Sequence, residues 1–332
     1  MSIIEKAVRG FGGKNDSGTE NRSNDPDLEN ASPAATDNRD IGATNSRGKR
    51  AELTDNSNLS PAQRSSGVLN VPISELHALG MVTQLAPRSE TAEAFRIVKR
   101  PLIMNMAGDG AADIDNANMI MVTSALQGEG KTFCTISLAM SIAMEQDKTV
   151  LLVDADTAKA SAGKLCGVPH NALGLVDVLE NENIGLEDVI VSTNIPNLRI
   201  VPAGNVHERS TELLASDNMR VIMKQLSERY LDRVVIFDSP PILLATEASV
   251  LAHYMGQIVF VVAAEDTSQH AIKEALQYLG NDQIVGMLLN KYRPSPLDKF
   301  GHGYGYGYGY GYGQRNRSRE NPEEGNVGMA SS

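Results

Sequence analysis

The sequence of 332 residues contains no tryptophan and only two cysteines, Cys134 and Cys166, and aromatic residues make up 5% of it. Two cysteines are too few for a disulfide framework or a cysteine-rich metal site, so a reducing compartment is expected. No apolar run reaches the ~18 residues that a membrane-spanning helix needs. Glu5, Lys6 and Arg9 interrupt the apolar residues near the N-terminus, which argues against a secretory signal. We therefore expect a cytoplasmic chain.

The sequence also lacks an excess of positive charge. Lysine and arginine number 30 against 41 aspartates and glutamates, which gives a net charge of −11 and an isoelectric point of about 5.1. A protein that coats nucleic acid needs the opposite balance. The short basic run at Arg315, Arg317 and Arg319 is too small to reverse it. No nucleic-acid partner is expected.

The two ends of the chain are poor in residues that could form a core. Residues 1–12 place apolar side chains at helical spacing, which predicts a short amphipathic helix. This helix is either a frayed terminus or a docking peptide for a membrane-embedded partner or a bilayer surface. Residues 13–72 are mostly small and polar and predict a disordered linker. Residues 298–332 predict a flexible tail.

Between these ends, apolar runs alternate with helical patterns. The runs expected to be strands are 119–122, 150–153, 198–201, 234–237, 258–263 and 284–289, and the helical patterns between them are 132–145, 211–230, 245–255 and 268–280. Unbroken Val, Ile and Leu runs are typical of parallel strands covered on both faces. We therefore predict a doubly wound α/β domain at 119–297, with a mainly parallel sheet and helices on both faces. A helical lead-in at 73–118 precedes it.

The segment 124–132 has the pattern of a phosphate-binding loop, because it follows a strand, is rich in glycine and opens a helix. Gly128 and Gly130 allow the backbone N–H groups to curl around an anion. Lys131 can then reach the β- and γ-phosphates of ATP, and the Thr132 hydroxyl can ligate Mg²⁺.

Three aspartates follow predicted strands. Asp154 and Asp156 end the second strand, and Asp238 ends a later one. Because the carboxyl ends of parallel strands meet at one edge of a sheet, these side chains should lie close together. Mg²⁺ prefers oxygen ligands and keeps several waters, so two carboxylates, Thr132 and phosphate oxygens would suit it. ATP and Mg²⁺ are the expected cofactors.

Five of the nine tyrosines lie in a Gly-Tyr repeat near the C-terminus: Tyr304, Tyr306, Tyr308, Tyr310 and Tyr312. Glycine on both sides leaves each phenol accessible, and the repeat cannot pack a core. The last strand ends at the nucleotide edge, and the chain from residue 296 to residue 304 can span at most ~25–30 Å. We expect these tyrosines to accept phosphate. The alternative is a low-complexity tail that self-associates.

Together, the segments 124–132, 151–156 and 235–241 and the tyrosine cluster resemble the bacterial tyrosine kinases of the P-loop type. In finer detail the chain resembles the tyrosine autokinases associated with exosortase-type exopolysaccharide loci. The resemblance implies an ATP- and Mg²⁺-dependent kinase that phosphorylates its own C-terminal tyrosines, in trans within an oligomer, and so regulates exopolysaccharide polymerisation and export. It also implies a transmembrane co-polymerase or chain-length determinant partner, a tyrosine phosphatase, and a place at the inner face of the plasma membrane through the partner.

The resemblance also assigns roles to residues. Lys131 would be catalytic, Asp156 and Asp238 would hold Mg²⁺ with Thr132, and Asp154 would orient or deprotonate the phenol. The residues expected to contact the nucleotide are Gly128, Glu129, Gly130, Lys131, Thr132, Phe133 and Asn290, with Asn290 at the adenine. Free tyrosine and aspartate differ by ~6 pKa units, so proton transfer to Asp154 should come late in the reaction.

A charged row on the lead-in helix completes the resemblance. Glu93, Arg96 and Lys99 match the E-x-x-R-x-x-R helix that joins the family's subunits head to tail in a ring, with Lys in place of the last Arg. We expect the three side chains to share roughly one face. A solvated charged face is the plainer interpretation.

Two other functions fit parts of the sequence. A nucleotide-gated scaffold ATPase usually carries a lysine five residues before the loop lysine, where this chain has Leu126. A regulator with degenerate ATPase chemistry is suggested by the segment 157–160, which lacks the Arg and Pro that usually follow the paired acids. The tyrosine tail favours the kinase.

Overall fold

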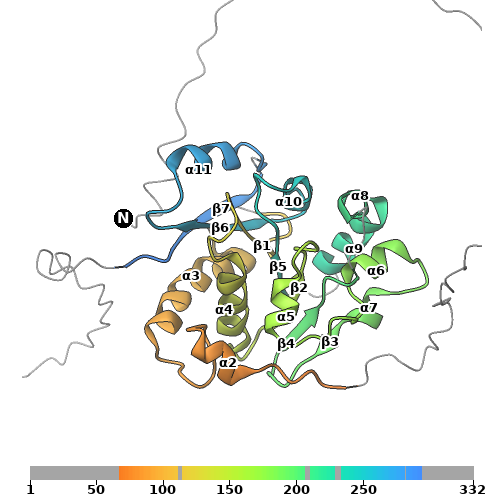
Figure 1. The fold of residues 1–332 in the computed structure, drawn as a ribbon, viewed down its shortest axis with the longest axis horizontal. Helices are drawn as coiled ribbons and strands as arrows, with labels where there is room; N and C mark the ends of the chain where they lie inside the picture. Colours follow the sequence, from red (N-terminus) through yellow and green to blue (C-terminus); the bar gives the residue numbers. More distant parts are fainter. Residues whose placement is uncertain (1–66, 111–113, 206–209, 229–232, 281, 294–332) are drawn as a thin grey trace, which may run out of the picture. The chain divides into compact units, whose positions relative to one another are not determined.

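The computed structural model describes residues 67–110, 114–205, 210–228, 233–280 and 282–293 (Figure 1). The predicted N-terminal helix, the linker up to residue 66 and the five tail tyrosines lie outside the described residues. No helix in the described part is long and apolar enough to cross a membrane.

Within the described residues, seven strands form one sheet in the order β3-β4-β2-β5-β1-β6-β7. The strands are β1 (Met119–Ser124), β2 (Thr149–Asp154), β3 (Val191–Ser192), β4 (Leu198–Val201), β5 (Arg233–Asp238), β6 (Gln257–Ala263) and β7 (Ile284–Asn290). Neighbouring strands are parallel except β3, which is antiparallel to β4. The predicted mainly parallel sheet is confirmed.

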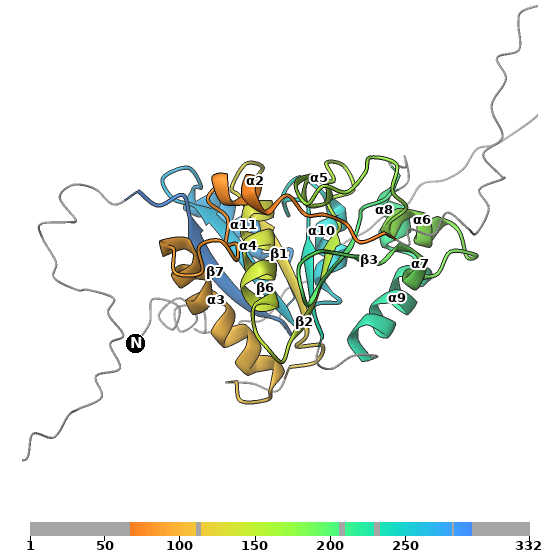
Figure 2. The same cartoon turned by 90° about the horizontal axis from the view of Figure 1, so that it is seen from below.

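Helices cover both faces of the sheet. They are α2 (Ile73–Ala78), α3 (Glu90–Met106), α4 (Lys131–Ala143), α5 (Ser161–Leu165), α6 (Leu175–Glu180), α7 (Leu186–Val189), α8 (Ser210–Leu214), α9 (Asp217–Glu228), α10 (Thr246–Ala252) and α11 (Gln269–Leu276). In Figure 2, α3 and α4 lie in front of the strands, whereas Figure 1 shows α10 and α11 on the opposite side of the sheet. The order is therefore helix, sheet, helix.

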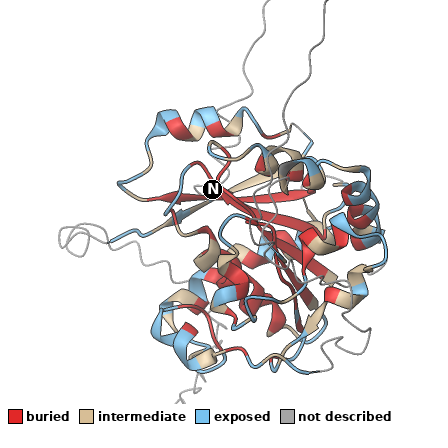
Figure 3. Ribbon diagram, turned by 45° about the vertical axis from the view of Figure 1, so that its right-hand side comes forward, coloured by how far each residue is buried: buried red, intermediate tan, exposed pale blue. Residues whose placement is uncertain are grey.

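The alternation of side chains along each strand builds two hydrophobic cores. Ile120 and Val122 belong to the core under α2, α3 and α4, whereas Met119 and Met121 belong to the core under α6 to α11. All six residues of β1 are buried, and Figure 3 shows the central strands almost entirely buried. Burying a side chain such as Phe237 stabilises the fold by about 2–3 kcal/mol. Burial on both faces explains why the strands read as unbroken apolar runs.

Several elements differ from the sequence prediction. The helix expected at 211–230 is divided into α8 and α9, because the Ser216 hydroxyl accepts a hydrogen bond from the Met219 backbone N–H at 3.3 Å and restarts the helix. Within the predicted helical lead-in, α3 continues through Pro101 to Met106. The short elements α5, α6, α7 and β3 were not predicted.

The lead-in also begins earlier than expected. The linker prediction extends to residue 72, but the Leu69 backbone N–H donates to the Ser192 carbonyl at 2.8 Å, and the Leu69 carbonyl accepts from the Asn194 N–H at 3.0 Å. Val71 is buried in the same core as α2. These backbone bonds and the burial of Val71 show that residues 69–71 pack with the domain and do not belong to a linker.

Candidate functional site

The phosphate-binding loop joins the end of β1 to the start of α4. Gly128 and Gly130 have φ angles of 84° and 94°, in the left-handed region that favours glycine. A Cβ atom on Gly130 would lie 2.1 Å from the Nδ2 atom of Asn290, whereas a Cβ on Gly128 would meet nothing within 4 Å. Gly130 is therefore required both by its backbone and by the close approach of Asn290.

The loop delivers free backbone donors at the N-terminus of α4. Cys134 N–H makes the first bond of this helix, to the Gly130 carbonyl at 3.0 Å. The N–H groups of Lys131, Thr132 and Phe133 precede it and have no carbonyl to bond within the helix. Together with the partial positive charge of the helix end, they form a site for a phosphate group.

Asp238, at the end of β5, is fixed by two hydroxyls of α4. Its Oδ2 accepts from Thr132 at 2.8 Å and its Oδ1 accepts from Thr135 at 2.9 Å. The side chain is fully buried, and burial raises the pKa of Asp238 to about 6 against the opposing effects of the two hydroxyls and Lys131. The sequence did not single out Thr135, although its position three residues after Thr132 places it on the same side of the helix.

Asp154, at the end of β2, lies directly opposite Asp238 in the strand register. Its Oδ2 accepts from the Gly163 backbone N–H at 2.8 Å, whereas its Oδ1 has no hydrogen-bond partner among the described residues. Burial, followed by repulsion from Asp238, raises the pKa of Asp154 to about 8. The pKa gap to a phenol therefore narrows from ~6 units to about 2 units in the absence of ligand.

Lys131 and Asp156 complete the charged group. Both side chains are buried, with exposed fractions of 7% and 5%. Burial lowers the pKa of Lys131, while Asp238 and then Asp156 oppose that shift, so the ammonium group lies within the field of both carboxylates. The predicted residues Lys131, Thr132, Asp154, Asp156 and Asp238 are thus brought together at one edge of the sheet.

The site provides only oxygen ligands for a metal ion. Among the described residues, no group of three or more His, Cys, Asp or Glu side chains is arranged to hold a metal by itself. Mg²⁺ is commonly held by one or two carboxylates together with substrate phosphates. The Thr132 hydroxyl, Asp238 and Asp156 fit that mode because nucleotide phosphates would supply the remaining oxygens.

Two further predicted residues hold the loop in shape. The Asn290 side-chain amide donates to the Glu129 carbonyl at 2.9 Å. The Glu129 carboxylate is buried, and its Oε2 accepts from the Leu126 backbone N–H at 2.5 Å. Its Oε1 accepts from the hydroxyl of Thr267, a residue that no sequence pattern had singled out. In this structure, Glu129 and Asn290 thus bond to the protein around the loop.

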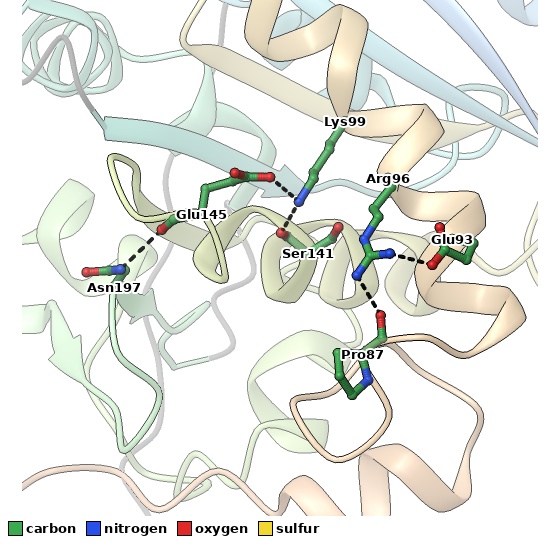
Figure 4. A network of polar contacts seen from close by, with 7 residues as sticks. All are labelled: Pro87, Glu93, Arg96, Lys99, Ser141, Glu145 and Asn197. Atoms are coloured by element: carbon green, nitrogen blue, oxygen red, sulfur yellow. Dashed lines mark hydrogen bonds and ion pairs between the residues drawn. The ribbon is translucent and has the colours of Figure 1, made fainter. Parts of the chain in front are cut away.

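The charged row on α3 does not form one surface. Arg96 is paired with Glu93 on the exposed side of the helix and donates to the Pro87 carbonyl at 2.8 Å (Figure 4). Lys99 is 7% exposed, donates to the Ser141 carbonyl at 2.6 Å and is paired with Glu145 at 2.5 Å. The expectation of a shared face therefore fails for Lys99. Each three-residue step rotates a side chain by about 60°, so Lys99 lies about 120° from Glu93 around the helix.

Comparison with known proteins identifies the family. The AAA domain family matches residues 117–283, about half of the chain. Tyrosine-protein kinase CpsD of Streptococcus pneumoniae serotype 4 is 32% identical over 189 residues, which cover 56% of this chain and 81% of that protein. Tyrosine-protein kinase YwqD of Bacillus subtilis is 27% identical over 225 residues, which cover 67% of this chain and 90% of that protein.

A solved structure agrees with these relatives. The kinase domain of VpsO has 27% sequence identity and a TM-score of 0.50, covering 62% of this chain and all of that domain. The phosphate loop, the aspartates at the strand ends and the mainly parallel sheet match what such a kinase requires. The chain therefore belongs to the AAA domain family and, within it, to the bacterial protein-tyrosine kinases that bind nucleotide through a P-loop.

Proposed function

We propose that this kinase transfers the γ-phosphate of ATP to its own C-terminal tyrosines, Tyr304, Tyr306, Tyr308, Tyr310 and Tyr312, and does so in trans between copies of the chain. The observation that carries the proposal is the buried Asp154, whose Oδ1 has no hydrogen-bond partner among the described residues and which lies opposite Asp238, the carboxylate bonded to Thr132 of the loop helix. A carboxyl with one oxygen still able to accept, at the edge of the sheet that carries the phosphate loop, suits an incoming hydroxyl. The glycine-flanked phenols of the tail supply such hydroxyls.

Charge neutralisation at the phosphates falls to Lys131 and the N-terminus of α4. Mg²⁺, held by Thr132, Asp238 and Asp156, would supply further positive charge at the β- and γ-phosphates. Because phosphoryl transfer passes through a loose transition state, holding the reactants in line matters more than forming a strong nucleophile. The hydrogen bonds from the Thr132 and Thr135 hydroxyls to Asp238 support this, because they hold the carboxylate in one orientation.

Asp154 positions the phenol and takes its proton. The pKa of Asp154 is raised to about 8, so it lies closer to the pKa of a phenol than the pKa of a solvent-exposed aspartate does. Asp154 takes the proton in its ionised form: the phenolic proton moves to Oδ1 of the carboxylate as the new P–O bond to tyrosine forms, while the bond from the γ-phosphorus to the β,γ-bridging oxygen breaks and ADP leaves. Gly163 N–H holds the other oxygen in place and so fixes the direction of Oδ1.

Assembly into a homo-oligomer, such as a ring, would use the exposed side of α3. Glu93, Arg96 and Arg100 are exposed there, with Arg96 paired to Glu93, whereas Lys99 is buried and engaged with α4. Arg100 follows Glu93 by seven residues, so the two share a face of the helix. We propose that Arg100, rather than Lys99, supplies the second cation of this surface.

The wider setting rests on the resemblance to autokinases of exopolysaccharide loci. It supports a role in regulating exopolysaccharide polymerisation and export, together with a transmembrane co-polymerase partner and a tyrosine phosphatase. The chain would then be cytoplasmic and held at the inner face of the plasma membrane by its partner. Isolation of this chain from detergent-solubilised membranes in a stable complex with a transmembrane protein would test whether such a partner exists.

Phosphate mapping separates this function from a scaffold ATPase. Purified full-length protein is incubated with ATP and Mg²⁺, and phosphotyrosine is located by mass spectrometry. We expect phosphate within residues 304–312, and none in Lys131→Met, because the loop loses its cation. ATP hydrolysis without phosphotyrosine would instead support the scaffold. The relatives that carry the name tyrosine-protein kinase favour the first outcome.

A further inference from the structure

The phosphate loop is connected to the turn between β6 and α11 through a buried carboxylate. The Glu129 side chain belongs to a residue that is 3% exposed, and both of its oxygens are occupied. One oxygen accepts from the Leu126 N–H across the loop, and the other accepts from the Thr267 hydroxyl. A buried carboxylate that lost either donor would retain an uncompensated charge.

Thr267 is itself held in place. Its hydroxyl oxygen accepts from the Ala263 N–H at 3.0 Å, and its own N–H donates to the Ala263 carbonyl at 3.1 Å. Ala263 is the last residue of β6, a strand buried along its whole length. The bonds to Ala263 therefore hold the Thr267 side chain against a buried strand, and the hydroxyl donates its single proton to Glu129.

The same turn is bonded to the end of β7, which closes the network. The Ala264 N–H donates to the Asn290 carbonyl at 2.8 Å, and the Asn290 amide donates to the Glu129 carbonyl at 2.9 Å. The loop, the turn and the end of β7 thus hold one another through side-chain and backbone bonds. None of these bonds uses the N–H groups of Lys131, Thr132 or Phe133.

We propose that Thr267 is a positioning residue for nucleotide binding. Its hydroxyl holds the Glu129 carboxylate, which holds the Leu126 N–H and so keeps the loop in the shape that receives phosphate before the nucleotide arrives. A preformed loop spends no binding free energy on ordering itself. The inference rests on nucleotide binding at this loop and does not depend on phosphorylation of the tail.

The test compares variants of the full-length protein by calorimetric titration with ADP and Mg²⁺. Thr267→Val keeps the shape of the side chain but removes both the donor to Glu129 and the acceptor for the Ala263 N–H. We expect its affinity for ADP to fall by roughly tenfold to a hundredfold, the range for loss of a hydrogen bond to a buried charged group. Thr267→Ser restores the donor and should stay within about twofold of the parent.

Ser268→Ala is the matched control. Ser268 is the next residue, and its hydroxyl caps α11 by accepting from the Ala271 N–H at 3.1 Å without contacting Glu129. Its loss should lower the melting temperature but leave the ADP affinity unchanged. Melting without nucleotide also checks that each variant folds, and Thr267→Ala replaces the valine variant if that one does not.

Three results would overturn the proposal: parental ADP affinity in both Thr267→Val and Thr267→Ala, an equal loss in Thr267→Ser, or an equal loss in Ser268→Ala. The assay is independent of autophosphorylation. A kinase that binds ADP normally but leaves the tail unmodified would contradict the proposed function without affecting the role of Thr267.

Discussion

At the scale of single residues, the chemistry depends on how deeply each acid is buried. The sequence identified Asp154 and Asp238 because each follows an apolar run. It could not show that a backbone N–H holds one oxygen of Asp154 while the other has no partner in the described chain, because Gly163 is nine residues away on α5. Nor could it reveal Thr267, whose contact with Glu129 depends entirely on how β6 and the loop pack.

Asp154 should make the stability of the nucleotide-free protein depend on pH. Its pKa is raised from 3.8 to about 8 in the folded protein, so between these values the unfolded carboxyl is ionised while the native one keeps its proton. The native state therefore loses stability as pH rises through this window. Asp154→Asn removes the effect and keeps an acceptor for Gly163 N–H.

We expect Asp154→Asn to gain unfolding free energy relative to the parent between pH 5 and pH 8.5, by at most roughly 5 kcal/mol. Urea unfolding at the two pH values measures the gain. The burial of Asp238 raises its pKa in both proteins, so the comparison reports Asp154 together with its repulsion from Asp238. An advantage of the same size at both pH values would refute the raised pKa.

Gly130 should tolerate no side chain. Gly130→Ala combines a left-handed backbone with a Cβ atom 2.1 Å from the Asn290 amide. We expect a loss of about 1–3 kcal/mol of unfolding free energy together with at least tenfold weaker ADP binding. The control is Gly108→Ala, which has a φ of 78° but an open surrounding, and which should lose stability while binding ADP normally. Equal ADP affinity in both variants would count against the close approach of Asn290.

At the scale of elements, the sequence located the strands that are buried on both faces and missed those that are short. The strands β1, β2 and β5 read as unbroken apolar runs, whereas β3 has two residues and α7 has four, too few for a periodic pattern. Helical spacing also misled the placement of Lys99. Each step of three residues changes the direction of the side chain around the helix, so the third charged residue of the row, Lys99, is buried against the domain.

Lys99 should therefore matter for stability and not for assembly. Lys99→Met removes its bonds to the Ser141 carbonyl and Glu145, and we expect a loss of about 1–3 kcal/mol of unfolding free energy. Arg96→Glu, on the exposed side of α3, should change stability by less than about 1 kcal/mol but reduce self-association. Chemical unfolding and light scattering measure the two effects. Dissociation of the oligomer by Lys99→Met without loss of stability would contradict this assignment.

At the scale of the whole molecule, the fold gathers the phosphate loop and three acids at one edge of the sheet. The sequence predicted this arrangement because parallel strands deliver their carboxyl ends to a common edge. Which tyrosine reaches the site depends on the chain beyond residue 293, outside the described residues. We claim that phosphate passes between two copies of the chain.

A mixing experiment tests that claim most directly. One full-length variant carries Lys131→Met and intact tyrosines, and the other is catalytically intact but has phenylalanine at positions 304, 306, 308, 310 and 312. With ATP and Mg²⁺, neither variant alone should acquire tail phosphotyrosine, whereas the mixture should show phosphotyrosine on the tail of the Lys131→Met copy. Phosphorylation of the parental protein, with an unmodified Lys131→Met tail in the mixture, would contradict transfer between copies.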